Sequence, residues 1–432
     1  MVNVNDFRGN SDSERIENAM RAIGADGIVV IPPREADDGR TMWVIDRAIL
    51  LPENTTVILQ NCTIKLSDAC RDNFFRSANC GLGIEDIRPI SNIHIRGEGI
   101  CTLLGADHPR ATGDSSKVLA RPCPKTKEDL CKMADWIPEE RRSVDKITFT
   151  DEHYHSYGTD AGKVGESQYG DWRGIGILFA NVERFSISNL RIVESHGWGV
   201  SCENCAYGRI EKLDFDAKMA RFIDGMLMNT ENQDGVDLRN GCHDIVVSDI
   251  TGGTGDDLIA LTAIAGKTYH KSGALRTTHV MHSDWTKRSK DIYNIIIRNV
   301  VGYSKGNVCH HILMLPANGA RIYNIVVDGL IDTAPADCRD SGGIKLGCGD
   351  GEYGVSTPEG LSNIAISNCV FNGERAIFVE GFLVNSTISN VINNNPDCPV
   401  IEVRRIDGMK NTLTSNIFAA GNNAVEESNL FR

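Results

Sequence analysis

The stretch IYNIIIRNVVG at residues 292–302 is followed by IYNIVVDGLID at residues 322–332, so that Asn294 and Asn324 stand 30 residues apart. Similar runs begin at residues 90, 185, 242, 361 and 384. Each is a short series of alternating β-branched residues followed by Asn, Asp or Gly, and a second aliphatic run comes after it, as in DLIALT, HILML and GGIKLG. This alternation is typical of β-strands, and its recurrence indicates a repeat protein.

The spacing of the repeats points to a solenoid. Equivalent asparagines lie 22 residues apart at Asn368 and Asn390 and 39 apart at Asn324 and Asn363, which fits a coil of roughly 20–25 residues with loops of variable length. A coil this small cannot bury its own apolar face, so the coils must stack. No helical pattern separates the runs, which excludes a doubly wound α/β sheet. We therefore predict an all-β fold, a right-handed parallel β-helix (solenoid); a β-propeller or stacked β-sandwich is the alternative architecture.

The N-terminal segment SDSERIENAMRAI, residues 11–23, predicts a helix that caps the solenoid. Ser11 is expected as its N-cap, and Glu14, three residues later, completes a capping box. The apolar residues that follow recur at helical spacing.

Asparagine recurs where the strand-like runs end, at Asn189, Asn299, Asn368 and Asn390. Asparagine tolerates the left-handed αL conformation of a turn, and stacked side-chain amides can form a ladder. These residues are therefore expected to shape the corners of the coils and to have no part in chemistry.

We expect one domain over residues 1–432, interrupted by polar insertions at about 105–170 and 265–290. Insertions in a solenoid map to loops on one face, which is often the binding face. The second insertion is rich in Lys, Arg and His. Both insertions are expected to wall the same groove as Asp234.

Composition narrows the partners. The formal net charge of −13 argues against nucleic acid, which needs a basic surface. No stretch of 18 apolar residues predicts a membrane span, and the N-terminus has no signal-like segment. The 14 cysteines are scattered without zinc-ligand spacing, which favours reduced thiols, no metal and no cofactor. We expect a cytoplasmic location, with secretion open if a signal peptide precedes this chain, and leave a homo-oligomer open.

Two acidic clusters lie in NQDGVDLRNGCHDIVVSDITGGTGDDLIAL, residues 232–261. Asp256 follows Asp234 by 22 residues, about one coil, and coils stack roughly 4.8 Å apart. Asp234, Asp256 and Asp257 are therefore expected to crowd together, which favours one protonated and one ionised carboxyl group. Hydrolysis of a glycosidic bond needs such a pair. Calcium binding or turn formation is the alternative. Asp237 and Asp244 are expected to serve turns or to face solvent.

Here the sequence resembles a family. NQDGVD followed one coil later by GDDLIAL resembles the NTDG and DD motifs of the polygalacturonase-like glycoside hydrolase family 28, within the pectin-lyase-like superfamily of parallel β-helices, and the first 33 residues are similar to that superfamily's start. The resemblance implies that Asp256 is the general acid, and that Asp234 and Asp257 position and activate water. It extends loosely to about residue 350.

The resemblance also implies substrate-binding residues. The family's Gly-His-Gly motif falls at VCHHIL, which offers His310 or His311 without the glycines. Its Arg-x-Lys motif, which binds the carboxylate of galacturonate, falls at SGGIKLG, where Lys345 is present and Gly343 replaces the arginine. Arg339 is a candidate substitute for that arginine.

Four more residues are candidates from the sequence itself. Trp172, Arg173 and Trp198 are expected as platforms for sugar rings. His196 is a candidate for substrate contact, with a structural turn role as the alternative.

The function predicted from the sequence is a glycoside hydrolase that cleaves an oligo- or polysaccharide, uronic-acid-containing substrates included, with inversion. A β-helix polysaccharide lyase or fructosyl-transferring enzyme is one alternative. A non-catalytic carbohydrate-binding β-helix is the other.

Overall fold

Short parallel strands dominate the structure, a computed structural model. It describes residues 1–24, 27–36, 38–68, 70, 72–81, 87–107, 147–149, 154–156, 168–169, 172–217, 220–223, 226–229, 232–266, 268–269, 275–276, 279–281, 289–305, 309–335, 338, 342–349, 353–421 and 425–427. The chain divides into two compact units. Unit 1 comprises Met1–Gly208, Leu213–Gln233 and Tyr269–Ser283, and unit 2 comprises Arg209–Lys212, Asp234–Thr268 and Asp284–Arg432. Each unit is described by itself, and the single domain stays a prediction.

Unit 1 holds two parallel sheets and one helix. One sheet contains β1 (Val2–Asn3), β2 (Ile28–Ile31), β3 (Trp43–Ile45), β5 (Thr55–Gln60), β6 (Thr63–Leu66), β8 (Ile90–Glu98), β9 (Thr102–Leu104), β14 (Val182–Val193) and β16 (Ala206–Asp216). The other contains β4 (Ile49–Leu51), β7 (Phe75–Ser77), β13 (Ile177–Ala180) and β15 (Val200–Glu203). Short turns of 3-10 helix lie at η1 (Val4–Asp6) and η4 (Trp172–Gly174).

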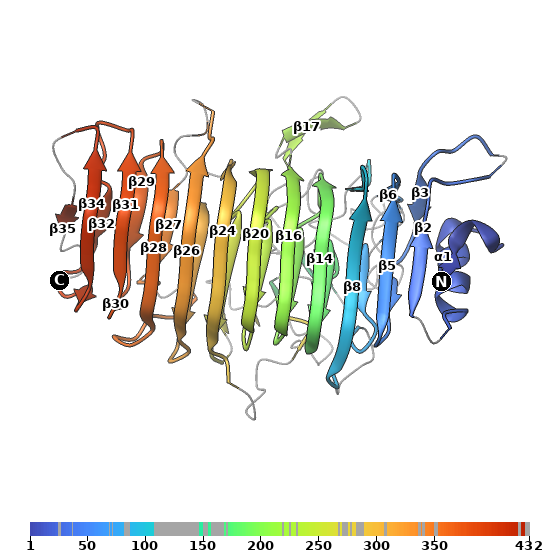
Figure 1. Cartoon of the computed structure of the whole chain (residues 1–432), viewed down its shortest axis with the longest axis horizontal. Helices are drawn as coiled ribbons and strands as arrows, with labels where there is room; N and C mark the ends of the chain where they lie inside the picture. The colour runs from blue at the N-terminus through green and yellow to red at the C-terminus, as the bar shows by residue number, and fades with distance from the viewer. Residues whose placement is uncertain are drawn as a thin grey trace. The chain divides into compact units, whose positions relative to one another are not determined.

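Unit 2 also has two parallel sheets. The first contains β20 (His243–Thr254), β24 (Ile292–Ser304), β26 (Ile322–Asp332), β28 (Leu361–Phe371), β30 (Leu383–Val384), β31 (Thr387–Asn393), β33 (Met409–Lys410) and β34 (Leu413–Ala419). The second contains β19 (Val236–Arg239), β21 (Ile259–Ile264), β25 (His310–Ala317), β27 (Gly342–Leu346), β29 (Arg375–Val379), β32 (Ile401–Val403) and β35 (Val425–Glu427). The chain alternates between the two sheets, and each strand pairs with its counterpart one coil later (Figure 1), which is the solenoid predicted from the repeats.

Further short strands lie within the two insertions. They are β10 (Ile147–Phe149), β11 (Tyr154–Ser156), β12 (Gln168–Tyr169), β22 (Thr268–Tyr269) and β23 (Leu275–Arg276). Between β16 and β19, outside both insertions, β17 (Ala220–Ile223) and β18 (Met226–Asn229) form an antiparallel pair. Most residues of both insertions lie outside the described residues, so the prediction that they wall the groove of Asp234 is not tested.

The asparagine corners are confirmed. Asn189, Asn299, Asn368 and Asn390 have φ between 54 and 58°, the left-handed region that asparagine tolerates. Nδ2 of Asn390 donates to Oδ1 of Asn368 over 3.1 Å, so the side-chain amides form a ladder. The strands carrying these corners are longer than the short runs expected, at 13 residues for β24. The reason is that a single αL residue turns the chain while pairing continues on both sides of it.

The N-terminal helix is also confirmed. Helix α1 (Asp12–Arg21) begins after Ser11, whose side chain accepts the backbone N–H of Glu14 over 3.2 Å. Ile16 and Ala19 are fully buried, and the helix packs on β2, β3 and β4 at the N-terminal end of unit 1 (Figure 1). Among the described residues, no helix is both long and apolar enough to cross a membrane.

Candidate active site

One row of residues in unit 2 crosses the strands of the second sheet. Val236 pairs with Ile259, and Ile259 pairs with Ile312. Counting back two residues from each places Asp234, Asp257 and His310 in one row on three successive coils. The backbone N–H of Gly235 donates to the carbonyl of Asp257 over 2.9 Å, which holds the first two rungs together. The expected stacking of Asp234 one coil before the second cluster is therefore confirmed, with Asp257 as its direct neighbour.

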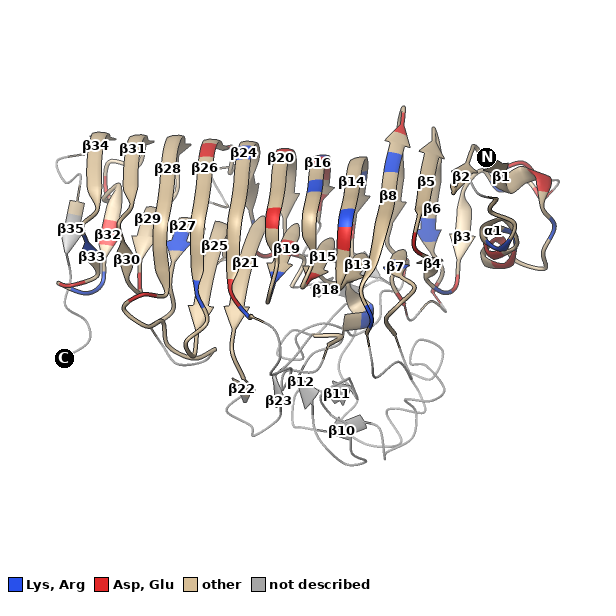
Figure 2. Cartoon of the chain, turned by 60° about the horizontal axis from the view of Figure 1, so that its bottom comes forward, with Lys and Arg blue, Asp and Glu red and all other residues tan. Residues whose placement is uncertain are grey.

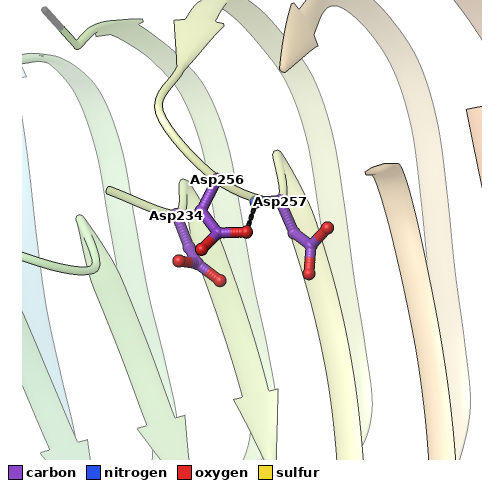
Figure 3. Close-up of side chains that lie close together, drawn as sticks. All are labelled: Asp234, Asp256 and Asp257. Carbon is purple, nitrogen blue, oxygen red and sulfur yellow. Dashed lines mark hydrogen bonds between the residues drawn. The ribbon is translucent and has the colours of Figure 1, made fainter. Parts of the chain in front are cut away.

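The three predicted catalytic aspartates meet in one cluster. Asp234, Asp256 and Asp257 each offer a carboxylate oxygen within 4.8 Å of the others (Figure 3). All three are buried, with 6, 9 and 7% of their surface exposed. The backbone N–H of Asp257 donates to Oδ1 of Asp256 over 3.1 Å. Three carboxyl groups this close together can supply a proton donor and a proton acceptor to one reaction, or they can hold a divalent cation.

Hydroxyl groups fix the backbone between the two adjacent aspartates. The carbonyl oxygen of Asp256 accepts hydrogen bonds from Oγ1 of Thr254 over 2.7 Å and from Oγ of Ser304 over 2.8 Å. Both hydroxyl-bearing residues are almost fully buried. The turn that carries Asp256 is therefore held from two neighbouring coils.

His310 is the histidine that reaches this cluster. Its backbone N–H donates to Oδ1 of Asp257 over 2.6 Å, and its Nδ1 lies 3.3 Å from the same oxygen. Gly342, the next residue of the row, leaves room for the ring, because a Cβ there would lie 2.7 Å from Cδ2 of His310. The glycine at position 342 thus leaves space for the imidazole ring, although the Gly-His-Gly motif itself is missing.

His311 lies on the opposite side of the strand. It is 0% exposed, its Nδ1 donates to the carbonyl of Gly342 over 2.7 Å, and its Nε2 lies 3.1 Å from Oδ1 of Asp332. Burial would raise the pKa of Asp332, but hydrogen bonds from His311 and from two backbone N–H groups hold that pKa below its usual value. His311 is a structural hydrogen-bond partner of Asp332 in the core.

Asp237 corrects an expectation. The sequence suggested a turn or solvent-facing residue, but β19 begins at Val236, so Asp237 lies within the strand and is only 1% exposed. Burial and repulsion from Asp257 and Asp256 raise its pKa well above the usual value, against the opposing effect of Arg239. The missed signal is the alternation in GVDLR, which places Asp237 and Arg239 on the same face. Asp244, by contrast, has the expected turn conformation, with φ of 55°.

Lys345 is held in an ion pair. Its Nζ lies 2.8 Å from Oε2 of Glu380, whose other oxygen, Oε1, accepts from Nη1 of Arg404 over 3.1 Å. Glu380 is 3% exposed, and sequence reasoning missed it as the partner of Lys345. Arg339, the other candidate for binding a carboxylate, lies outside the described residues.

The remaining candidates belong to unit 1. Trp172 and Arg173 are 2 and 4% exposed, and the guanidinium of Arg76 lies 5.2 Å from the centre of the Trp172 ring. Trp198 is half-buried. Nε2 of His196 accepts the backbone N–H of Ala106 over 2.9 Å, which gives this buried histidine a structural contact. Substrate contact by these four residues stays a prediction.

One anchor of the second insertion was missed. Glu203, at the end of β15, accepts the backbone N–H groups of Val280 and Met281 over 3.1 and 3.3 Å, and Nδ1 of His279 lies 3.0 Å from it. This buried carboxylate ties residues 279–281 to the sheet of unit 1.

Comparison with known proteins bears on the fold. No protein-family model and no curated protein matches the sequence. Among solved structures, the tailspike protein of E. coli bacteriophage HK620 in complex with a pentasaccharide matches at 11% identity with a TM-score of 0.52, over 99% of this chain and 64% of that chain. At this identity the match shows the fold, and it confirms the right-handed parallel β-helix.

Two exopolygalacturonases are also similar in structure. The family 28 enzyme of Yersinia enterocolitica is 12% identical with a TM-score of 0.47, over 99% of this chain and 77% of that chain. The hyperthermoactive enzyme of Thermotoga maritima is 15% identical with a TM-score of 0.49, over 96% and 91%.

Proposed function

We propose that this protein is a glycoside hydrolase that cleaves a glycosidic bond of an oligo- or polysaccharide with Asp234, Asp256 and Asp257. The observation that carries the proposal is the buried cluster of these three carboxyl groups, one coil apart and next to His310. The sequence resemblance to family 28 supports it, as do the solved structures named above, a pentasaccharide-binding tailspike and two exopolygalacturonases.

The three groups are proposed to take distinct roles. The backbone N–H of His310 donates to Oδ1 of Asp257 over 2.6 Å and holds that carboxyl group in place. The resemblance to family 28 makes Asp257, together with Asp234 on the adjacent coil, the group that positions and activates water. The resemblance assigns the acid role to Asp256, which would protonate the leaving oxygen while water attacks the anomeric carbon.

Inversion follows if water, rather than a carboxylate, attacks. Asp234 and Asp257 lie on neighbouring rungs and can hold one water between them. Carboxyl groups this close are more typical of retaining enzymes, in which one of them forms a covalent intermediate. The configuration of the product therefore decides between the two modes of attack.

A panel of defined oligosaccharides tests the proposal. The wild-type protein is expected to release new reducing ends from at least one of them, and Asp256→Asn should lower this rate by roughly 10²–10⁴-fold. A wild-type protein that binds oligosaccharides without cleaving them would instead support a non-catalytic binding role.

A lyase is the second candidate, favoured by the same cluster. Three carboxylate oxygens within 4.8 Å of one another suit a divalent cation, and carboxylates are the oxygen ligands that calcium prefers. A lyase of this kind should lose its activity in a chelator and regain it with Ca²⁺. It should also release an unsaturated product that absorbs ultraviolet light. The hydrolase that we propose retains its activity in the chelator.

A further inference from the structure

The strand that continues the proposed catalytic row, β27, carries a lysine that is already in an ion pair. Lys345 lies on β27, two coils beyond Asp257 and three residues along the strand from Gly342 in the row. With coils roughly 4.8 Å apart and residues about 3.3 Å apart along a strand, its Cα lies on the order of 14 Å from that of Asp257. An oligosaccharide held by the three aspartates and extending toward β27 would meet this side chain.

The partner of the lysine is built into the fold. Glu380 follows β29 and is 3% exposed, so its carboxylate cannot leave easily for solvent. It holds Nζ of Lys345 at 2.8 Å and Nη1 of Arg404 at 3.1 Å. The guanidinium of Arg404 also lies 4.9 Å from the centre of the Phe378 ring, which fixes it on the far side. Charged residues of both signs lie on neighbouring strands in this part of unit 2 (Figure 2).

A second cation cannot be supplied from position 343. A Cβ on Gly343 would lie 2.1 Å from the carbonyl oxygen of Ala376 and 2.5 Å from Cε1 of Phe371. Both neighbours belong to the packed core, so no side chain fits there without moving backbone. The strand therefore presents one lysine, and that lysine is paired.

We propose that Glu380 acts as an internal carboxylate that occupies Lys345, so that the sugar unit bound over β27 is uncharged. This inference rests on the proposed carbohydrate site and names its substrate class. A uronate at this position would have to compete with Glu380 for the ammonium group. A neutral sugar can accept a hydrogen bond from Nζ while the ion pair stays intact. Glu380 is thus a residue that determines specificity, without contact to the reacting atoms.

Matched sugars test the inference. The probes are pairs of oligosaccharides. Each pair consists of a uronate oligomer and its carboxyl-reduced counterpart with the same linkage. Calorimetry measures how tightly each member binds to the Asp256→Asn protein, which is used so that cleavage does not interfere. We expect the neutral member of a pair to bind at least as tightly as the uronate. Adding Glu380→Gln should tighten uronate binding by about tenfold or more, because a freed charged donor is gained, and leave neutral binding unchanged.

Two further variants serve as controls. Glu402→Gln makes the same change in net charge one coil beyond Glu380, where Glu402 pairs with Arg375 over 3.3 Å, and should not improve uronate binding. Lys345→Met should leave uronate binding unchanged and weaken neutral binding by no more than the one hydrogen bond lost from Nζ, and it serves even if Glu380→Gln does not fold. Tighter binding of the uronate by the parent protein, lost in Lys345→Met, overturns the inference. The inference is also overturned if the protein binds neither member of any pair. Sugar binding with the expected preference but without cleavage by the wild type would defeat the proposed hydrolysis alone.

Discussion

The backbone N–H of His310 donates a 2.6 Å hydrogen bond to Oδ1 of Asp257, although 53 residues separate them. The contact exists because parallel pairing of β21 with β25 places the two residues on successive coils. It holds the carboxylate of Asp257 against the next coil, and the row of Asp234, Asp257 and His310 organises the candidate site.

Replacing any one of the three clustered aspartates should greatly slow the reaction without unfolding the protein. Asp234→Asn, Asp256→Asn and Asp257→Asn should each lower kcat by roughly 10²–10⁴-fold, because each removes a proton-transfer or water-activating group. Their melting temperatures should match or exceed that of the wild type, because like charges are no longer crowded. Activity assays beside thermal unfolding check this. Full activity with a lower melting temperature would make these residues structural.

The adjacent residues His310 and His311 should differ in function, with His310 affecting the reaction rate and His311 affecting stability. His310→Ala keeps the backbone N–H bond to Asp257 but removes the contact from Nδ1, so it should lower kcat by up to about 10²-fold through a shifted Asp257 and a misplaced attacking water, with little change in stability. His311→Ala should lower the free energy of unfolding by about 3–5 kcal/mol, because Asp332 is left as a buried, partly unpaired charge. Urea unfolding and kinetics on both variants make the comparison. Equal losses of stability would mean that His310, too, is structural.

The sequence predicted the asparagine corners more completely than it predicted the candidate site. Asparagine at regular positions reveals the corners, because few other residues adopt αL geometry, and the two acidic motifs one coil apart reveal their contact. The choice between His310 and His311 was open, since it depends on which face of β25 each side chain occupies. Asp237 was misplaced because it lies three residues after Asp234–Gly235, a pair that is typical of a turn. Glu380 was missed because its partner Lys345 is 35 residues away, and loop lengths decide such a pairing.

A second ladder of side-chain amides, formed by Asn294, Asn324 and Asn363, should contribute measurably to stability. Nδ2 of Asn324 donates to Asn294 over 3.0 Å, and its Oδ1 accepts from Asn363 over 3.1 Å, with φ of 57°. Asn324→Ala should cost about 1–2 kcal/mol from the αL conformation alone and more from the two lost hydrogen bonds. Asn324→Gly keeps the backbone conformation and should lose less. Chemical unfolding of the pair measures the difference, and equal losses would show that the backbone conformation contributes nothing.

Asp237 should make stability depend on pH. Its pKa is raised well above the usual value, so the folded protein retains a proton that the unfolded chain releases above about pH 4. The stability that this group contributes is fully present below that pH and is lost as the pH rises through the folded pKa. Asp237→Asn should therefore be more stable than the wild type at neutral pH, and the gain should shrink toward about pH 4. Unfolding at a series of pH values gives the profile; a variant that is less stable at neutral pH would show that the carboxylate form is needed.

The configuration of the first product tests most directly whether Asp234, Asp256 and Asp257 hydrolyse a glycosidic bond through a water held between two of them. Proton NMR of a cleaved oligosaccharide, recorded before mutarotation, reports the anomer at the new reducing end. The predicted result is inversion by the wild-type protein and a rate lower by roughly 10²–10⁴-fold for Asp256→Asn. Retention of configuration, or an unsaturated product with no new hydrolytic end, would contradict it.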